Sequence, residues 1–127
     1  MEWQTLKVEE NRDDHYAIVS FNRPEAANAL STQMAKDIIS VMEYLTDEID
    51  IWAVILTGSG EKAFCAGADL KERKDMTKDQ IRWQRALFVR AFQSVLNFPK
   101  PIIAAVNGFA MGGGFDALHF HDTRGMG

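Results

Sequence analysis

Two short segments rich in glycine and alanine are the places where this chain could do chemistry with its backbone. They span residues 63–70 and 107–114, and each follows a run of apolar residues. Small side chains let a ligand approach the backbone closely, and a loop that opens into a helix directs free N–H groups at that ligand. Two such loops could hold one carbonyl oxygen and stabilise its developing negative charge by about 3 kcal/mol per donor. The spacing therefore predicts a site for an oxyanion.

The elements that would position these loops begin with a hairpin and a helix. Residues 5–9 and 15–21 are rich in Val, Ile, Tyr and Phe and are separated by polar turn residues, which favours two antiparallel strands. Ser31 stands where a helix N-cap belongs, ahead of apolar residues at helical spacing. The apolar positions of this predicted helix are Met34, Ile38, Val41, Met42 and Leu45.

Two further strands lead toward the loops. Residues 52–57 and 102–106 are continuous apolar runs, which are typical of strands buried on both faces of a parallel sheet. Between them, Thr77 to Gln80 fits a capping box, and an apolar stripe reaching Asn97 predicts the longest helix. Alternating strands and helices predict an α/β fold, in which ligands bind beyond the carboxyl ends of the strands. The stripe consists of Ile81, Phe88, Ala91, Phe92 and Val95.

Composition limits the class of protein. The chain has 127 residues, 46% of them hydrophobic, which suits a single domain with one modest core. The net charge of −4 and the interleaved basic and acidic residues give no reason to expect a polyanion or a membrane surface as partner. One cysteine cannot form an internal disulfide, and no segment reads as a signal peptide or a membrane span. A cytoplasmic location is the expectation.

Three motifs resemble those of the crotonase superfamily, the enoyl-CoA hydratases and isomerases. Residues 63–70 read A-F-C-A-G-A-D-L, and residues 100–114 read K-P-I-I-A-A-V-N-G-F-A-M-G-G-G. Residues 23–30, R-P-E-A-A-N-A-L, are similar to a family motif that lies beside the CoA moiety. The resemblance runs in register from about Leu6 to Gly114. It implies a crotonase-like (ClpP/crotonase) spiral of β-β-α units, incomplete at its C-terminus, with residues 1–127 as one truncated domain.

The resemblance also implies which residues carry the chemistry. The oxyanion hole would be the backbone N–H groups of Ala68 and Gly113. Asp116 stands at the position of the first catalytic carboxylate, usually Glu, and its shorter reach matters because a displacement near 1 Å costs on the order of 100-fold in rate. An Asp in a first helical turn would equally complement the helix dipole, so both interpretations of Asp116 stay open. The residues implied to line the thioester and CoA site are Ala26, Asn28, Ala66, Gly67, Ala68, Asp69, Leu70, Gly112 and Gly113.

The implied function is that of an enoyl-CoA hydratase/isomerase-like protein that binds an acyl-CoA thioester and stabilises its enolate. Hydration of a 2-enoyl-CoA in fatty-acid metabolism is the leading reaction, and CoA enters only as part of the substrate, without a separate cofactor or a metal. The family's second carboxylate lies about twenty residues beyond the first, past Gly127. The alternative is therefore a non-catalytic remnant that binds acyl-CoA or partner subunits. A homo-oligomer, a trimer or hexamer, is expected if the family's C-terminal half is present.

Other interpretations of the glycines have less support. Gly112, Gly114 and Ala117 fit the dinucleotide pattern G-x-G-x-x-A, but the glycines start five residues after the apolar run, and the acidic ribose residue would fall beyond the chain. A Walker loop is disfavoured because no Lys-Ser or Lys-Thr follows the glycines. A flexible turn is disfavoured because the alanine-rich loop at residues 66–68 accompanies them.

Other reactive residue types also have a simpler explanation. Cys65 lies between apolar residues without a His or carboxylate at a telling position, which favours a packed thiol over a nucleophile. His119 and His121 are two apart and would not face each other on a helix, so a metal site is disfavoured. The basic residues within 71–90 are diluted by acidic ones, which favours a solvated face that could contact CoA phosphates over an RNA-binding surface.

Overall fold

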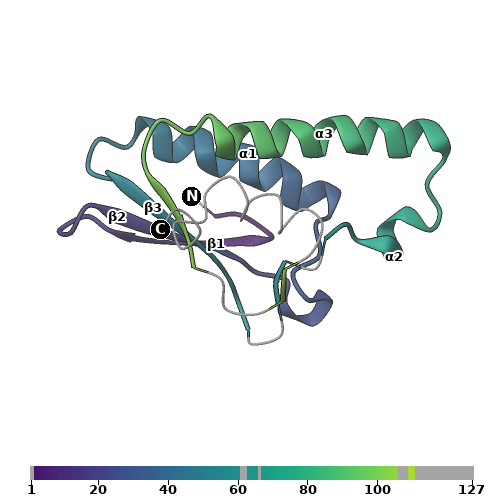
Figure 1. The fold of residues 1–127 in the computed structure, drawn as a ribbon, viewed down its shortest axis with the longest axis horizontal. Helices are drawn as coiled ribbons and strands as arrows, with labels where there is room; N and C mark the ends of the chain where they lie inside the picture. The colour runs from purple at the N-terminus through teal and green to yellow at the C-terminus, as the bar shows by residue number, and fades with distance from the viewer. Residues whose placement is uncertain (1, 61–62, 66, 106–108, 111–127) are drawn as a thin grey trace.

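A four-stranded sheet forms the base of the molecule. The computed structural model describes residues 2–60, 63–65, 67–105 and 109–110 (Figure 1). The sheet has the order β1-β2-β3-β5, in which β1 is antiparallel to β2 and the other neighbours are parallel. A short parallel pair, β4 with β6, lies outside this sheet. The strands are β1 (Leu6–Asn11), β2 (Tyr16–Phe21), β3 (Ala53–Gly58), β4 (Ala63–Cys65), β5 (Ile102–Ala104) and β6 (Phe109–Ala110).

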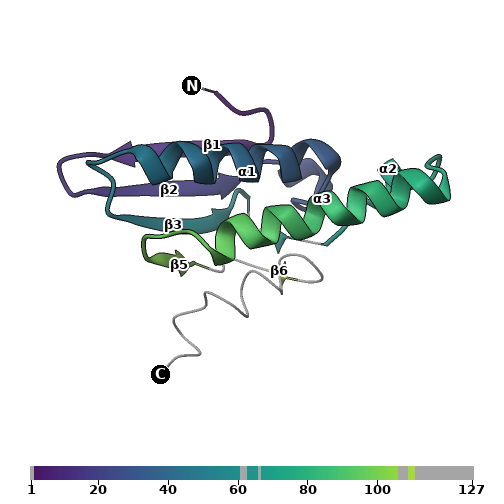
Figure 2. The ribbon, with the colours of Figure 1, turned by 90° about the horizontal axis from the view of Figure 1, so that it is seen from above.

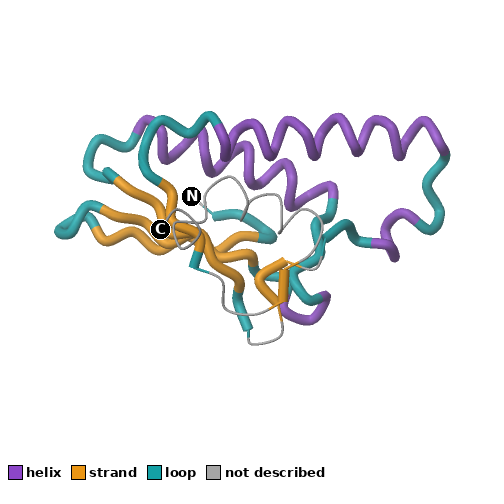
Figure 3. The backbone as a smooth tube through the Cα atoms, viewed as in Figure 1, coloured by secondary structure: helices purple, strands orange, loops and turns teal. Residues whose placement is uncertain are grey.

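Two long helices, α1 (Thr32–Asp47) and α3 (Lys78–Leu96), cover one face of the sheet, as Figures 2 and 3 show. Two short helical segments, η1 (Pro24–Ala26) and α2 (Leu70–Arg73), complete the described elements. Because β2, α1 and β3 form a parallel crossover, the predicted α/β class is confirmed. The predicted hairpin is also present, with its strands shifted by one or two residues.

The ends of the long helices have identifiable polar caps. The Ser31 hydroxyl accepts a hydrogen bond from the Met34 N–H at 3.1 Å, as its N-cap position predicts. At the start of α3, Thr77 and Gln80 exchange hydrogen bonds of 3.1 and 2.8 Å, so the predicted capping box is confirmed. Lys100 closes the other end of α1, where its ammonium group donates to the carbonyl oxygens of residues 45 and 48, each at 2.7 Å.

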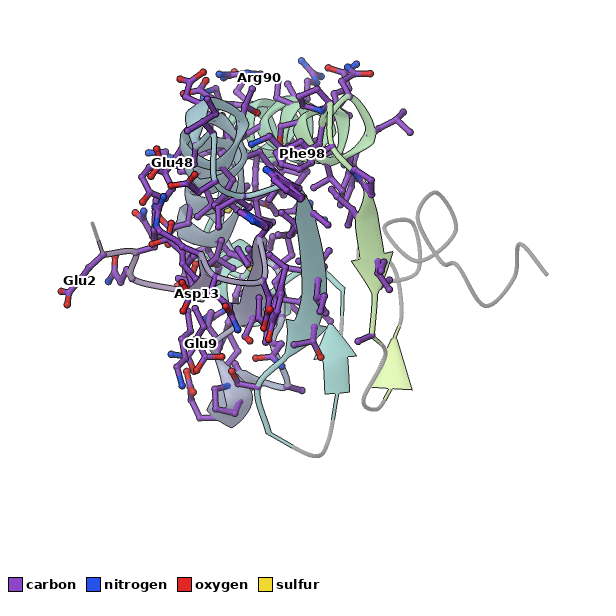
Figure 4. The ribbon with its side chains drawn as sticks, turned by 90° about the vertical axis from the view of Figure 1, so that its left-hand side faces the viewer. Glu2, Glu9, Asp13, Glu48, Arg90 and Phe98 are labelled. Atoms are coloured by element: carbon purple, nitrogen blue, oxygen red, sulfur yellow. The ribbon has the colours of Figure 1, made fainter. Side chains whose placement is uncertain are left out.

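The core lies between the sheet and the two helices. Figure 4 looks along these layers and shows side chains filling the space, with Phe98 inside and Arg90 on the outer side of the helices. On β3, Val54 and Leu56 are buried, whereas the residues that alternate with them are only half-buried. The prediction that this strand is buried on both faces was therefore wrong for the described residues, whose long helices pack on one face only.

Trp52 is a second correction to the sequence-based expectation. The strand begins at Ala53, and Trp52 precedes it with 60% of its surface exposed. Its ring stacks on His15, with ring centroids 3.6 Å apart and an interplanar angle of 5°. Its backbone N–H donates to the His15 carbonyl at 2.8 Å. An apolar residue at a strand boundary thus packs on the hairpin turn and not in the core.

A polar cluster ties the hairpin to the C-terminal half of α1. Arg12 Nη2 donates to Glu48 Oε1 at 2.6 Å and to Glu10 Oε1 at 2.9 Å. The Tyr44 hydroxyl also donates to Glu10, at 2.9 Å, and this bond is the main reason that the pKa of Tyr44 is raised to about 12. The cluster lies roughly 20 Å along α1 from the helix start, at 1.5 Å per residue, so it is remote from Leu30, which precedes the helix.

Candidate functional site

The first predicted loop, residues 63–70, begins with β4 and turns sharply at Gly67. Gly67 is buried and has a φ of +92°, in the left-handed region that glycine adopts without a steric cost. After this turn the chain enters α2 within three residues. The loop predicted over residues 63–70 is therefore a strand, a turn and the start of a helix.

Leu30 holds this turn from one side. Its N–H donates to the Gly67 carbonyl at 2.6 Å, and its own carbonyl accepts from the Asp69 N–H at 2.9 Å, which makes a parallel bridge to Ala68. Because the amides of an extended chain alternate in direction, the Ala68 N–H points away from Leu30. In the part of the chain that the structure describes, this N–H has no acceptor. One backbone donor is thus left open in a turn that is fixed on both flanks.

Asp69 fixes the next step of the chain. Its Oδ1 accepts from the backbone N–H groups of Lys71 and Glu72 at 3.0 and 3.2 Å, so it is the N-cap of α2. Its Oδ2 accepts from Arg23 Nη2 at 2.9 Å. Burial by itself raises the pKa of Asp69, but the Arg23 hydrogen bond and charge and the two N–H groups together hold it below the ordinary 3.8. This charged carboxylate therefore joins the start of α2 to Arg23, directly after Ala68 in the chain.

Arg23 joins the loop to the segment at residues 23–30. Besides Asp69, its guanidinium binds the Ala29 carbonyl through Nη1 at 2.7 Å. Asn28 is fully buried, and its side chain accepts from the Arg23 N–H at 2.8 Å and donates to the Ser59 carbonyl at 3.0 Å. Ala26 is half-buried at the end of η1. The structure thus places the motif at residues 23–30 beside the loop at residues 63–70, with the Asn28 amide engaged by protein atoms.

The second predicted loop is only partly described. β6 pairs in parallel with β4, with Ala63 opposite Phe109 and Cys65 opposite Ala110, so the strands that belong to the two loops run side by side. The glycine-rich sequence predicts a loop over residues 107–114, so this two-residue strand is a difference from the prediction. Ala66, Gly112, Gly113 and Asp116 lie outside the described residues, as do His119 and His121.

Leu70 differs from the other predicted site residues. It is the first residue of α2, and 76% of its surface is exposed. Glu72 and Gln84 are not among the predicted site residues, although they hydrogen-bond each other at 2.6 Å between α2 and α3. Gln84 lies between Ile81 and Phe88 at the spacing of the apolar stripe of α3. A polar side chain at such a position could have indicated a buried polar contact.

Comparison with known proteins gives a consistent assignment. A family model described as enoyl-CoA hydratase/isomerase matches residues 12–126. YngF of Bacillus subtilis is 45% identical over 113 residues, which cover 89% of this chain and 44% of YngF. A short-chain-enoyl-CoA hydratase of Clostridium acetobutylicum is 41% identical over 113 residues, with 89% and 43% covered. The crystal structure of an enoyl-CoA hydratase from Bacillus anthracis has a TM-score of 0.84 at 39% identity, with 90% and 44% covered.

The described fold, with its mixed sheet and paired loop strands, is of the crotonase class. Because the family model matches most of its length, the chain belongs to the enoyl-CoA hydratase/isomerase family. It spans less than half the length of the relatives it matches. No helix in the described ranges combines the length and apolar character needed to span a membrane.

Proposed function

We propose that this chain forms an acyl-CoA thioester site of the enoyl-CoA hydratase/isomerase type, in which the Ala68 N–H donates to the thioester oxygen. The observation that carries the proposal is the parallel bridge at Leu30, which engages the peptide groups on both sides of Ala68 and leaves its N–H on the opposite side. A donor fixed in this way loses little by reorganisation when an enolate forms, and one such donor contributes about 3 kcal/mol to the transition state.

The remaining roles come from the family resemblance. Gly113 would supply the second N–H, and the parallel pairing of β4 with β6 supports a shared site for the two loops. Asp116 would move the proton when water adds its hydroxyl to C3 and a proton to C2 of a 2-enoyl-CoA. Ala66, Gly67 and Gly112 would let the thioester approach the backbone closely. The segments at residues 26–28 and 69–70 would border the CoA moiety.

The direct test of catalysis is the loss of the conjugated enoyl-thioester absorbance of a short 2-enoyl-CoA. Asp116→Ala should abolish the rate, whereas Asp13→Ala, an exposed residue of the hairpin turn, should leave it unchanged. A rate equal to that of buffer, or one that survives in Asp116→Ala, would reject the catalytic role. Calorimetry with acyl-CoA then separates binding without turnover, the binding-only alternative, from no binding at all.

The role of Ala68 has its own pair of variants. Ala68→Pro removes the N–H, and because residue 67 is glycine the chain before it can accept a proline. Ala68→Gly keeps the N–H and is the matched control. A hydration rate of a short 2-enoyl-CoA that falls about 100-fold in the proline variant and stays within a few-fold of wild type in the glycine variant would support the proposal. Equal rates in the two variants would contradict it.

A further inference from the structure

A partly buried polar network joins α2 to both long helices. Glu72 Oε1 accepts from the Thr32 N–H at 2.9 Å, from the Thr32 hydroxyl at 3.1 Å and from Gln84 Nε2 at 2.6 Å. Thr32 is the first residue of α1, so the carboxylate satisfies an N–H that has no partner within that helix and complements the helix dipole. Three elements that are distant in sequence therefore meet at one carboxylate.

Gln84 uses each of its polar atoms in this network. Its side chain has no exposed surface. Nε2 donates to Glu72 and, at 3.0 Å, to the Thr32 hydroxyl, while Oε1 accepts from Arg73 Nε at 2.6 Å. Because an amide carries both donors and an acceptor, Gln84 serves a carboxylate and a guanidinium at once. The Arg73 guanidinium also lies over the Phe88 ring, 5.5 Å from its centroid.

These contacts contribute to the position of α2, together with the Asp69 N-cap. A helix of four residues is too short to be stable by its own hydrogen bonds, and none of its residues is buried. Its N-cap, Asp69, directly follows Ala68, and its last residue, Arg73, returns a backbone hydrogen bond to Asp69 at 3.3 Å. Movement of α2 would therefore be transmitted to the peptide that carries the Ala68 N–H.

We infer that Gln84 is a positioning residue for the oxyanion site: through Glu72 and Arg73 it sets the position of α2 and hence the direction of the Ala68 N–H. The inference rests on the proposed role of Ala68. Gln84 itself has no contact with the thioester in this scheme, because its polar atoms are all engaged with protein groups.

The test uses a chromophoric thioester, 4-dimethylaminocinnamoyl-CoA, whose absorbance shifts to the red when its carbonyl is polarised by hydrogen bonds. At saturating ligand the shift per bound molecule reports carbonyl polarisation and does not depend on the folded fraction. Gln84→Glu places a second carboxylate against Glu72 and should weaken binding about tenfold and reduce the shift by more than half. Gln93→Glu, on an exposed position of α3, is the control that should match wild type.

Exchanging the carboxylate of Glu72 and the amide of Gln84 tests whether the lost absorbance shift can be restored. The double variant Glu72→Gln with Gln84→Glu restores one amide and one carboxylate and places the new carboxylate beside Arg73. It should recover most of the shift that Gln84→Glu loses. Recovery supports positioning, and a single variant with the full wild-type shift at saturation overturns it.

Two further outcomes are distinguishable. A wild-type chain that produces no shift rejects the proposed oxyanion role itself, and the inference with it. If Gln84→Glu does not fold, Thr32→Val, which removes only a hydroxyl from the network, decides the question. A reduced shift in that variant supports the inference, and an unchanged shift contradicts it.

Discussion

Asn28 is a residue whose side chain joins segments that are far apart in sequence. Its amide connects the N–H of Arg23 to the carbonyl of Ser59, and none of its surface is exposed. Its φ of +55° lies in the left-handed region, which asparagine tolerates better than other residues with a side chain. The family resemblance marks this position as a substrate neighbour, while the contacts define a structural role beside it.

Asn28→Ala should lower the free energy of unfolding by about 2 kcal/mol, because it removes the partner of the partly buried Arg23 N–H and Ser59 carbonyl. Urea denaturation at neutral pH measures the change. Asn22→Ala, at an exposed position, is the control and should change stability by less than about 0.5 kcal/mol. Similar losses in the two variants would show that the buried amide contributes little.

Ala27 carries backbone strain that a single substitution relieves. Its φ of +52° is in the left-handed region, where a Cβ costs about 1–2 kcal/mol. Ala27→Gly removes that cost and adds unfolded-state entropy, so we expect a net gain of about 0.5–1 kcal/mol in thermal or urea unfolding. Ala35→Gly within α1 should instead lose about 1 kcal/mol. A loss in both variants would refute the strain argument.

Asp69 predicts a pH dependence. Since the folded-state pKa is lowered, the unfolded chain binds the proton more readily, and the carboxylate's contribution to stability is present above its ordinary pKa of 3.8. This contribution is lost as the pH falls through the lowered folded-state pKa. Asp69→Asn should therefore be destabilising at pH 7, and its difference from wild type should shrink progressively below about pH 4. Denaturation midpoints at several pH values test this, and a difference independent of pH would contradict it.

At the scale of elements, contacts within one segment could be predicted from the sequence, whereas contacts between distant segments could not. The helix starts could be predicted from Ser31 and from the pair Thr77 and Gln80, because an N-cap residue lies within three residues of the N–H that it binds. Thr32 and Glu72 are forty positions apart, and nothing local to either residue indicates the other. The sequence thus predicts where α1 begins, but not that a carboxylate of α2 binds its first N–H.

Lys100 is another element-scale contact that the sequence did not reveal. In the sequence it stands out only as the first residue of the motif at residues 100–114, whereas its ammonium group binds two carbonyl oxygens at the end of α1. Lys100→Met should lower the free energy of unfolding by about 2 kcal/mol, since a charged donor and its favourable interaction with the helix dipole are both lost.

Lys7→Met is the matched control for Lys100. Lys7 is exposed and pairs only at the surface with Glu9, at 3.3 Å, so its loss should be below about 0.5 kcal/mol. Both values come from urea denaturation. Equal losses of unfolding free energy in the two variants would show that water can replace Lys100 as the hydrogen-bond donor to the α1 carbonyls.

At the scale of the whole molecule, the α/β pattern followed from the sequence, while the extent of burial did not. The apolar run at residues 52–57 reads the same whether one face or both are covered. Only the placement of α1 and α3 on one side of the sheet separates these cases. The pairing of β4 with β6 was likewise hidden, because two or three residues carry too little pattern.

The uneven size of the two sheets predicts uneven local stability. β2 and β3 each have a hydrogen-bonded neighbour on both sides, whereas β4 and β6 have only each other in the described sheets. Hydrogen exchange should therefore show the slowest amides in residues 53–58 and exchange at least about tenfold faster in residues 63–65, through local opening. Equal protection in both segments would mean that the site opens only when the whole molecule unfolds.

The bridge between Leu30 and Ala68 has a consequence for engineering. Residues 67–73 are held by backbone bonds to Leu30, by Arg23 and by Thr32, so the loop and residues 23–32 form one module in space although they are separate in sequence. A chimera that takes the loop alone from a relative would inherit mismatched partners at these three points. A chimera that takes both segments, together with position 84, would keep the turn and the residues that hydrogen-bond to it from the same protein.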